Sequence, residues 1–479
     1  MAAAGAFRLS ALAPRPKLLV LVVLNQMRPD YLDSAASQFT PGGLRRILDK
    51  GAFYPDCRHL ASTFTASTLS TLATGAWPAQ HGIVADSWFD RAAGRPVRAS
   101  EEALLATTLA AQIEADPRMR SWVISLDESD AALFAGPGAS RLYWMNQEGL
   151  FTTRGDPPDW LSIYNLQRNP EAARNAHWVA AGAKPDAPPL RTLTWSPDHP
   201  RDFFNLYKAS PFAQAAQFDF LAELLARERM GQGGTTDVVF LLLGSTDRLG
   251  HETGGRSLLM PQMILQLDRR LEALFAQLAK TPGENAFNLV LAGAHGAPPE
   301  PPDESRARMA VDGETVAQAV AKNLAASDSG KVQHYLYPFL YLDTSGFRDP
   351  EPIRAQAGRA ALHHPAVADF FTAGGASSTF DGWDRRFRNS FHPLRSGDVM
   401  LSYRAEYVED FGPHRGVSYG SLYNYDVRVP LCFYGPQFRS GVYEGPVESV
   451  DVAATLARTL GVATPSSSVG RVLAEALVE

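Results

Sequence analysis

Residues 237–251, DVVFLLLGSTDRLGH, join a continuously apolar run to polar residues that could carry chemistry. Six apolar residues in a row, from Val238 to Leu243, are typical of a β-strand that is buried on both faces, as in a parallel sheet. Asp247 and His251 follow four residues apart, so a helical turn would place both side chains on one face. We therefore expect a parallel sheet whose strands end near a functional site.

Other short apolar runs alternate with helical patterns along the chain. The runs with strand character are residues 18–24, 122–126, 288–291 and 429–434. Several helical patterns between them end at a glycine, which supplies the left-handed cap position after a helix. This alternation predicts an α/β fold with a doubly wound, mostly parallel sheet and helices on both of its faces.

Two regions depart from the alternation. Residues 144–211 are rich in proline, tryptophan and asparagine with little periodicity, which predicts an irregular insertion packed over the sheet. Residues 335–405 carry strand-like pieces and one helical pattern, which predicts a small α+β cap. We therefore expect one α/β domain over residues 17–479 that contains both regions and follows a flexible leader at residues 1–16.

Composition excludes several classes of protein. The 479 residues include 45 Lys and Arg and 51 Asp and Glu, a net charge of −6, and no long basic run, which argues against a nucleic-acid partner. The apolar fraction of 45% excludes a disordered or fibrous chain. Two cysteines cannot build a disulfide framework or a cysteine zinc site.

No segment predicts a membrane span. The most apolar run, residues 18–24, has seven residues, whereas a spanning helix needs about 20. Pro14 and Pro16 stand where the apolar stretch of a signal peptide would form. We therefore expect a cytoplasmic protein.

Polar segments accompany the strand ends, where open α/β sheets bind their ligands. Taken singly each is a weak signal: Thr65 at a predicted helix start is more often a cap, and an Asp/His pair is more often a surface contact. The order and spacing of all five segments together indicate a functional site more specifically than any one segment does. The segments are NQMRPDY at 25–31, STFT at 62–65, GSTDRLGH at 244–251, AGAHG at 292–296 and YGSLYNYD at 419–426.

These segments, with GGLRRIL at 42–48 and TGAWPAQHGI at 74–83, resemble one family. The chain resembles the alkaline phosphatase superfamily, in its type I phosphodiesterase/nucleotide pyrophosphatase and single-domain alkaline phosphatase branch, from about Lys17 to Leu460. The resemblance implies two zinc ions that flank a threonine or serine nucleophile and clamp the transferring phosphoryl group. Thr65 matches that nucleophile, and three further residues match zinc ligands: Asp247, His251 and His295.

The remaining metal ligands implied by the resemblance are replaced. Asn25 and Ala294 stand where the second zinc would have aspartates, and Tyr419 stands where the first would have a histidine. One imidazole and a weak amide oxygen are too few ligands for zinc, and a neutral tyrosine is a poor one. His414 could substitute for Tyr419 if its loop folded back, but we expect it in solvent. The sequence thus predicts at most one loosely held zinc ion.

The residues that would contact the phosphoryl oxygens are also replaced. Asp127 and Ser129 stand where the phosphatase branch has a lysine and an arginine, and Asp86 stands where it has an asparagine. Like charges about 4 Å apart repel by roughly 4 kcal/mol at an intermediate dielectric constant. We therefore expect these acids to disfavour phosphate, or to point to solvent; either way the phosphate clamp is absent.

Three hypotheses follow. The first is a degenerate family member with little or no two-zinc phosphoester hydrolysis, which binds a small-molecule ligand in its cleft or serves as an interaction module. The second is an active one-metal hydrolase of phosphate or sulfate esters that uses Thr65 as its nucleophile. The third, an unrelated α/β binding protein, requires that the strand-end segments do not meet in space.

Overall fold

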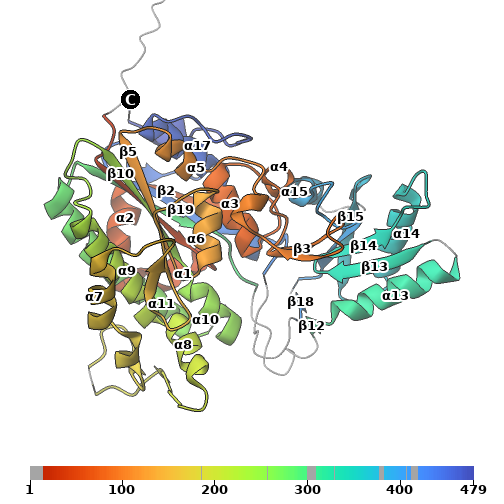
Figure 1. Ribbon diagram of the computed structural model, residues 1–479, viewed down its shortest axis with the longest axis horizontal. Helices are drawn as coiled ribbons and strands as arrows, with labels where there is room; N and C mark the ends of the chain where they lie inside the picture. The colour runs from red at the N-terminus through yellow and green to blue at the C-terminus, as the bar shows by residue number, and fades with distance from the viewer. Residues whose placement is uncertain are drawn as a thin grey trace, which may run out of the picture.

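The computed structural model describes residues 14–184, 186–255, 257–298, 309–327, 330–376, 382–405, 407–410 and 419–478. It has a larger lobe around a ten-stranded sheet and a smaller lobe around a five-stranded sheet (Figure 1). The order of the large sheet is β20-β2-β19-β11-β1-β10-β5-β6-β7, with β21 paired to β2. The short edge strands are β20 (Gly441–Val442) and β21 (Val447–Glu448). The predicted α/β fold with a mostly parallel sheet is confirmed.

Four parallel strands form the centre of this sheet. They are β1 (Leu18–Leu24), β5 (Met119–Ser125), β10 (Thr236–Leu243) and β11 (Phe287–Gly293). Every residue of β1, β10 and β11 is buried, as their apolar sequences predict. In the register, Leu24 pairs with Leu243 on one side and with Gly293 on the other, so these three strands end at the same level.

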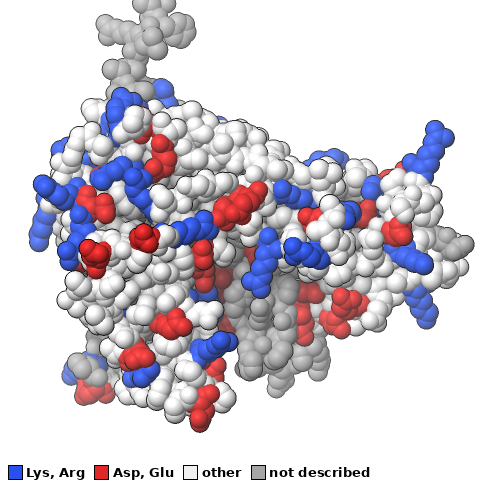
Figure 2. Space-filling model, in the orientation of Figure 1, with Lys and Arg blue, Asp and Glu red and all other residues white. Residues whose placement is uncertain are grey.

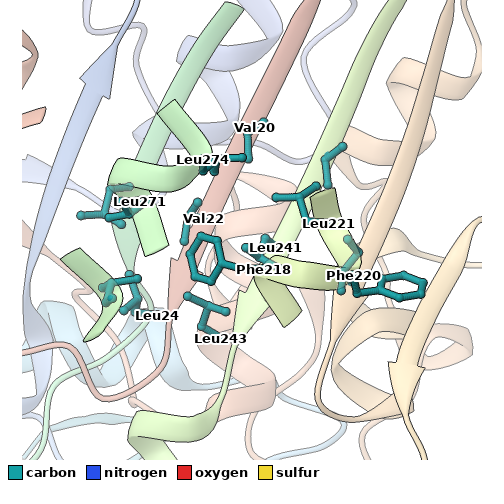
Figure 3. Packing of buried hydrophobic residues seen from close by; sticks show 14 of the residues in the cluster. Val20, Val22, Leu24, Phe218, Phe220, Leu221, Leu241, Leu243, Leu271 and Leu274 are labelled. Carbon is teal, nitrogen blue, oxygen red and sulfur yellow. The ribbon is translucent and has the colours of Figure 1, made fainter. Parts of the chain in front are cut away.

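Helices cover both faces of the sheet (Figure 1). On one face, the side chains of Val20, Val22 and Leu24 share a buried cluster with α9 (Pro211–Arg227) and α11 (Leu259–Leu278), as Figure 3 shows. On the opposite face, the alternate residues of β1 share a second buried cluster with α3 (Thr65–Thr74), α5 (Leu109–Glu114), α6 (Glu128–Ala135) and α17 (Asp451–Leu460). The central strands are thereby shielded from water on both sides.

Antiparallel strands extend the sheet beyond its parallel centre. β19 (Arg428–Tyr434) runs antiparallel to β11, and β2 (Ala52–Arg58) runs antiparallel to β19. The sequence did not predict β2, because Pro55, Asp56 and Arg58 interrupt its apolar pattern. On the other side, β6 (Leu142–Met145) runs parallel to β5, and β7 (Phe151–Thr153) runs antiparallel to β6.

Residues 144–211 pack over one face of the sheet. They include the helices α7 (Asp159–Gln167) and α8 (Pro200–Lys208) and a short pairing of β8 (His177–Trp178) with β9 (Arg191–Thr192). Trp178 and Phe203 from this region are buried in the same cluster as α9 and α11. The region therefore contributes to the core of the larger lobe.

The smaller lobe has its own sheet, of order β13-β14-β17-β15-β16. The strands are β13 (Lys331–Leu336), β14 (Phe339–Asp343), β15 (Val367–Thr372), β16 (Gly375–Ala376) and β17 (Val399–Tyr403). The helices α13 (Gly313–Ala326) and α14 (Glu351–Ala361) pack against it. The hairpin of β3 (Ser87–Asp90) and β4 (Arg95–Arg98) leads from the larger lobe to this sheet (Figure 1).

Two expectations concern the chain start and membranes. Residues 1–13 of the expected leader lie outside the described residues, whereas Arg15 forms an ion pair with Asp116 at 3.0 Å. Among the helices that the structure describes, none has the length and apolar character needed to cross a membrane.

The doubly covered sheet predicts a large effect of truncation at its centre. Leu241 of β10 is fully buried, so Leu241→Ala should lower the free energy of unfolding by about 2–5 kcal/mol in equilibrium urea unfolding. Leu166→Ala is the matched control, because Leu166 is 80% exposed, and should change it by less than about 0.5 kcal/mol. Equal effects of both variants would contradict the burial of β10.

Candidate functional site

The segments that follow the central strands are tied together by hydrogen bonds. The Thr246 hydroxyl donates to the Asn25 carbonyl oxygen at 2.5 Å, which joins the ends of β10 and β1. The Met27 amide donates to the His295 carbonyl oxygen at 2.8 Å, which joins the ends of β1 and β11. The predicted strand-end segments therefore meet in space, and the hypothesis of an unrelated binding protein is wrong.

Thr65 is the first residue of α3 and is 8% exposed. Its hydroxyl oxygen lies 3.2 Å from His295 Nε2. The preceding Thr63 fixes this segment to the loop before β19: its hydroxyl donates to the Ser421 carbonyl oxygen at 3.0 Å and accepts from the Gly420 amide at 3.1 Å. Thr65 is thus held at the strand ends by contacts on both sides.

His295 presents a lone pair to Thr65. His295 Nδ1 lies 2.8 Å from the Gly296 carbonyl oxygen, which can only accept, so Nδ1 carries the proton and Nε2 does not. Burial lowers the pKa of His295 and keeps the ring neutral. The Thr65 hydroxyl therefore donates to Nε2, which is the arrangement of an alcohol beside a base.

Asp247 and His251 lie on one face of α10 (Ser245–Thr253), as their spacing predicts. Asp247 Oδ1 is 3.4 Å from His251 Nε2 and 3.8 Å from His295 Nε2. Although burial alone would raise it, the pKa of Asp247 lies below its ordinary value, because His251 and Arg248 favour the carboxylate. The structure therefore brings Thr65, Asp247, His251 and His295 together.

Tyr419 occupies the space beside the two imidazoles. Its ring centroid lies 4.8 Å from that of His251 and 4.5 Å from that of His295. Its hydroxyl reaches Asp86 Oδ2 at 3.5 Å. Burial raises the pKa of Tyr419 well above its ordinary value, so the side chain is a neutral phenol rather than a phenolate that could bind zinc.

The second zinc position implied by the family resemblance lacks charged donors. Asn25 offers a neutral amide, and Ala294 offers a fully buried methyl group beside His295. Within the described ranges, no group of three or more His, Cys, Asp and Glu side chains is placed to hold a metal ion. His414 lies outside the described residues. The donors among the described residues do not fit a pair of zinc ions.

Asp127 differs from the sequence prediction. We expected it to repel anions or to point to solvent, but both of its carboxylate oxygens lie 2.7 Å from Arg248 Nη2, and Lys208 Nζ lies 3.7 Å from Oδ1. Its negative charge is therefore offset by two cations that the sequence analysis did not single out. Arg248 directly follows the predicted site residue Asp247, so its place in the sequence could have indicated that it lies near the site. Nothing in the sequence linked Lys208, at the end of α8, to Asp127.

The cations in turn depend on this pairing. Burial disfavours the charge of Arg248, but the negative charge of Asp127 outweighs this effect and raises the pKa of Arg248. For Lys208 the effect of burial is larger than that of Asp127, so the pKa of Lys208 is lowered. Lys208 Nζ also donates to the Leu126 and Met145 carbonyl oxygens, at 3.3 and 3.1 Å. Both cations are thus committed to protein partners.

Two other acids line the same region. Asp86 Oδ1 accepts from the Ala66 amide at 2.9 Å and so caps the start of α3, while the surrounding protein raises the pKa of Asp86 by desolvation. Desolvation raises the pKa of Asp130 well above its ordinary value, with Asp127 and Asp86 adding repulsion. Ser129 lies exposed on α6 beside them. These acids hold protons more tightly than free carboxyl groups do.

Asp426 is a buried acid in the segment before β19, and its sequence position indicated no role for it. Its Oδ2 accepts from the Ser421 amide at 3.1 Å and the Ser421 hydroxyl at 2.5 Å, which fixes the loop after Tyr419. Burial raises the pKa of Asp426 to about 7. Its charged form therefore destabilises the folded chain near neutral pH.

This shift predicts a pH-dependent effect of Asp426→Asn. Because the pKa in the folded chain is about 7 and the ordinary value is 3.8, the cost of the carboxylate is absent below about pH 4 and complete above about pH 7. The asparagine keeps an acceptor for Ser421 and carries no charge. We expect the variant to match the parent near pH 4 and to be more stable by a few kcal/mol above pH 7, in urea unfolding. A difference that does not change with pH would contradict the buried carboxylate.

Comparison with known proteins gives consistent matches over most of the chain. Residues 19–332 match the family described as type I phosphodiesterase / nucleotide pyrophosphatase. Alkaline phosphatase PhoV of Synechococcus elongatus is 26% identical, with 97% of this chain and 93% of the relative covered. Alkaline phosphatase PafA of Elizabethkingia meningoseptica is 24% identical, with 97% and 95% covered.

Solved structures show the same fold. The crystal structure of wild-type alkaline phosphatase PafA superimposes with a TM-score of 0.85 at 22% identity, covering 98% of this chain and all of that one. Murine ectonucleotide pyrophosphatase / phosphodiesterase 5 superimposes with a TM-score of 0.57 at 16% identity, covering 93% and 95%.

Proposed function

Because this chain belongs to the type I phosphodiesterase / nucleotide pyrophosphatase family of the alkaline phosphatase superfamily, we propose that its cleft is descended from a phosphoester-hydrolysing site and no longer performs two-zinc hydrolysis. The cleft instead binds a small-molecule ligand. The observation that carries this proposal is the neutral Tyr419 ring beside His251 and His295, at the position of a missing zinc ligand.

The chemistry of the remaining donors supports the same reading. A zinc pair that binds and activates a hydroxyl needs several imidazole and carboxylate donors around each ion. Asn25 and Ala294 remove two carboxylates from the second position, and Tyr419 removes an imidazole from the first. The relatives named as alkaline phosphatases are 24–26% identical to this chain. At this identity, their activity does not by itself imply the same activity here.

The charges of the cleft indicate which ligands it favours. Arg248 and Lys208 are paired with Asp127, so they are not presented to a phosphate dianion. The carboxyl groups of Asp86 and Asp130 lie near Asp247. The charge of Asp247 raises the pKa of Asp86, and the charges of Asp86 and Asp247 raise the pKa of Asp130. A neutral or cationic ligand would meet less repulsion there than a phosphate monoester.

The Thr65–His295 hydrogen bond favours a second candidate function. A hydroxyl beside an unprotonated imidazole, at the N-terminus of α3, is suited to nucleophilic attack. With Asp247 and His251 close by, the second candidate is a one-metal hydrolase of phosphate or sulfate esters that uses Thr65 as its nucleophile.

Zinc content and turnover separate the two candidates. The purified chain is loaded with zinc, dialysed and analysed by mass spectrometry for metal, then assayed on p-nitrophenyl phosphate, bis-p-nitrophenyl phosphate and p-nitrophenyl sulfate. We expect fewer than two zinc ions per chain and no turnover above that of Thr65→Ala. A bound zinc pair with turnover that Thr65→Ala abolishes would sink the proposal, and one zinc ion with such turnover would establish the second candidate.

Restoring the missing donors should restore metal binding. The triple variant Asn25→Asp, Ala294→Asp and Tyr419→His supplies two carboxylates and one imidazole, so we expect it to bind at least one more zinc ion than the parent in isothermal titration calorimetry. Tyr419→Phe is the matched control, because it keeps the ring and adds no donor. A triple variant that binds no more zinc than this control would show that the replaced side chains do not explain the loss.

A further inference from the structure

A second cleft lies away from this site, between the β3–β4 hairpin and the smaller lobe. Its volume is about 840 Å³, within the range of small-molecule sites, and its walls come from the hairpin, from residues 100–103, from the start of α14 and from the segment 391–398. None of its lining residues belongs to the site described above. Figure 2 shows Lys and Arg side chains on the surface around β3, with a few acidic side chains among them.

Two arginines and one hidden carboxylate form the floor of the cleft. Asp398 is 4% exposed and accepts from Arg91 Nη2 at 2.9 Å, from Arg354 at 2.9 Å and from the Leu342 amide at 2.8 Å. The side chains of Arg91 and Arg354 are 35% and 22% exposed. Glu351 Oε2 also lies 3.7 Å from Arg354 Nη1, so Asp398 and Glu351 together balance these two arginines. The group still presents guanidinium surface to the cleft, while Asp398 is buried beneath it.

Two more arginines, Arg98 and Arg395, line the cleft, and Asp90 interacts electrostatically with Arg395. Arg395 donates through Nη1 to the Gly82 and Ala103 carbonyl oxygens, both at 2.7 Å, and its guanidinium lies 5.2 Å from the centre of the Trp88 ring. Carbonyl dipoles satisfy its hydrogens without cancelling its charge. Arg98 is exposed at the end of β4, and within the described residues it has no ion pair.

Three acids, Asp90, Glu102 and Asp398, line the cleft with the four arginines, which leaves one net positive charge among the lining residues. Asp90 is engaged by the Ala92 and Ala93 amides at 2.8 and 2.9 Å, so its carboxylate stabilises the hairpin turn. Leu394 is 80% exposed at the rim, and Trp88 closes the inner wall. The cleft thus combines arginines, whose planar guanidinium groups recognise sulfonate, carboxylate and phosphate oxygens, with apolar surface.

We propose that this cleft is a binding site for an organic anion with an aromatic or other apolar body. The anionic group contacts Arg98 and the guanidinium surface of Arg91, Arg354 and Arg395, and the apolar body packs on Leu394. The inference is independent of the proposed function, because it uses no residue of the Thr65 site.

A pair of fluorescent probes tests both halves of the proposal on the full chain. 8-Anilinonaphthalene-1-sulfonate carries an aromatic body and one anionic group, and N-phenyl-1-naphthylamine has the same rings without the charge. We expect saturable binding of the sulfonate, at least tenfold tighter than that of the neutral amine and weakened by added salt. Equal affinity for the two probes, or binding of the sulfonate that salt does not change, would overturn the role of charge.

Matched variants locate the site. Arg98→Glu should weaken sulfonate binding about tenfold or more, whereas Arg95→Glu should not, because Arg95 lies on the same strand and does not line the cleft. Leu394→Ala should weaken it severalfold, whereas Leu166→Ala should not, since both leucines are 80% exposed but only Leu394 lines the cleft. Equal effects within either pair would overturn the assignment, and all four residues are exposed enough for the variants to fold.

Discussion

The parallel register of β1, β10 and β11 is the constraint on which the rest of the structure depends. Hydrogen bonding aligns Leu24, Leu243 and Gly293, so the chain leaves all three strands at one edge of the sheet. Because these strands are buried on both faces, a slip of register would unpair buried backbone groups and expose apolar side chains. The polar residues that follow must therefore converge, whatever their chemistry.

This independence of backbone and chemistry would allow the change of site that we propose without loss of the fold. Ala294 is fully buried in the cluster under α3 and α17, and Asn25 is held through its backbone to β10 and Thr246. Neither position needs a metal-binding side chain to keep its place. The Tyr419 ring packs against His295, and its hydroxyl reaches Asp86, so contacts with the protein hold this side chain in place.

Charge in the larger lobe is balanced by residues from distant parts of the chain. Asp127 at the start of α6 meets Arg248 from α10 and Lys208 from α8, so a reading of Asp127 with its acidic sequence neighbours alone gave the wrong local charge. The second cleft follows the opposite pattern. There Asp398 is hidden beneath two arginines, so the surface is more basic than the chain's net charge of −6 implies.

The sequence by itself determined the central strands, the α/β class, the family and the segments that carry Thr65, Asp247, His251 and His295, because apolar runs and short motifs are local properties. It did not determine β2, whose interrupted pattern is completed by pairing with β19, or the partners of Asp127. Only the tertiary structure decided that Tyr419 lies against two imidazoles and that Lys208 reaches the carbonyl oxygen of Leu126, just after β5. Those contacts join residues far apart in the chain, and their distances and desolvation depend on how the elements pack.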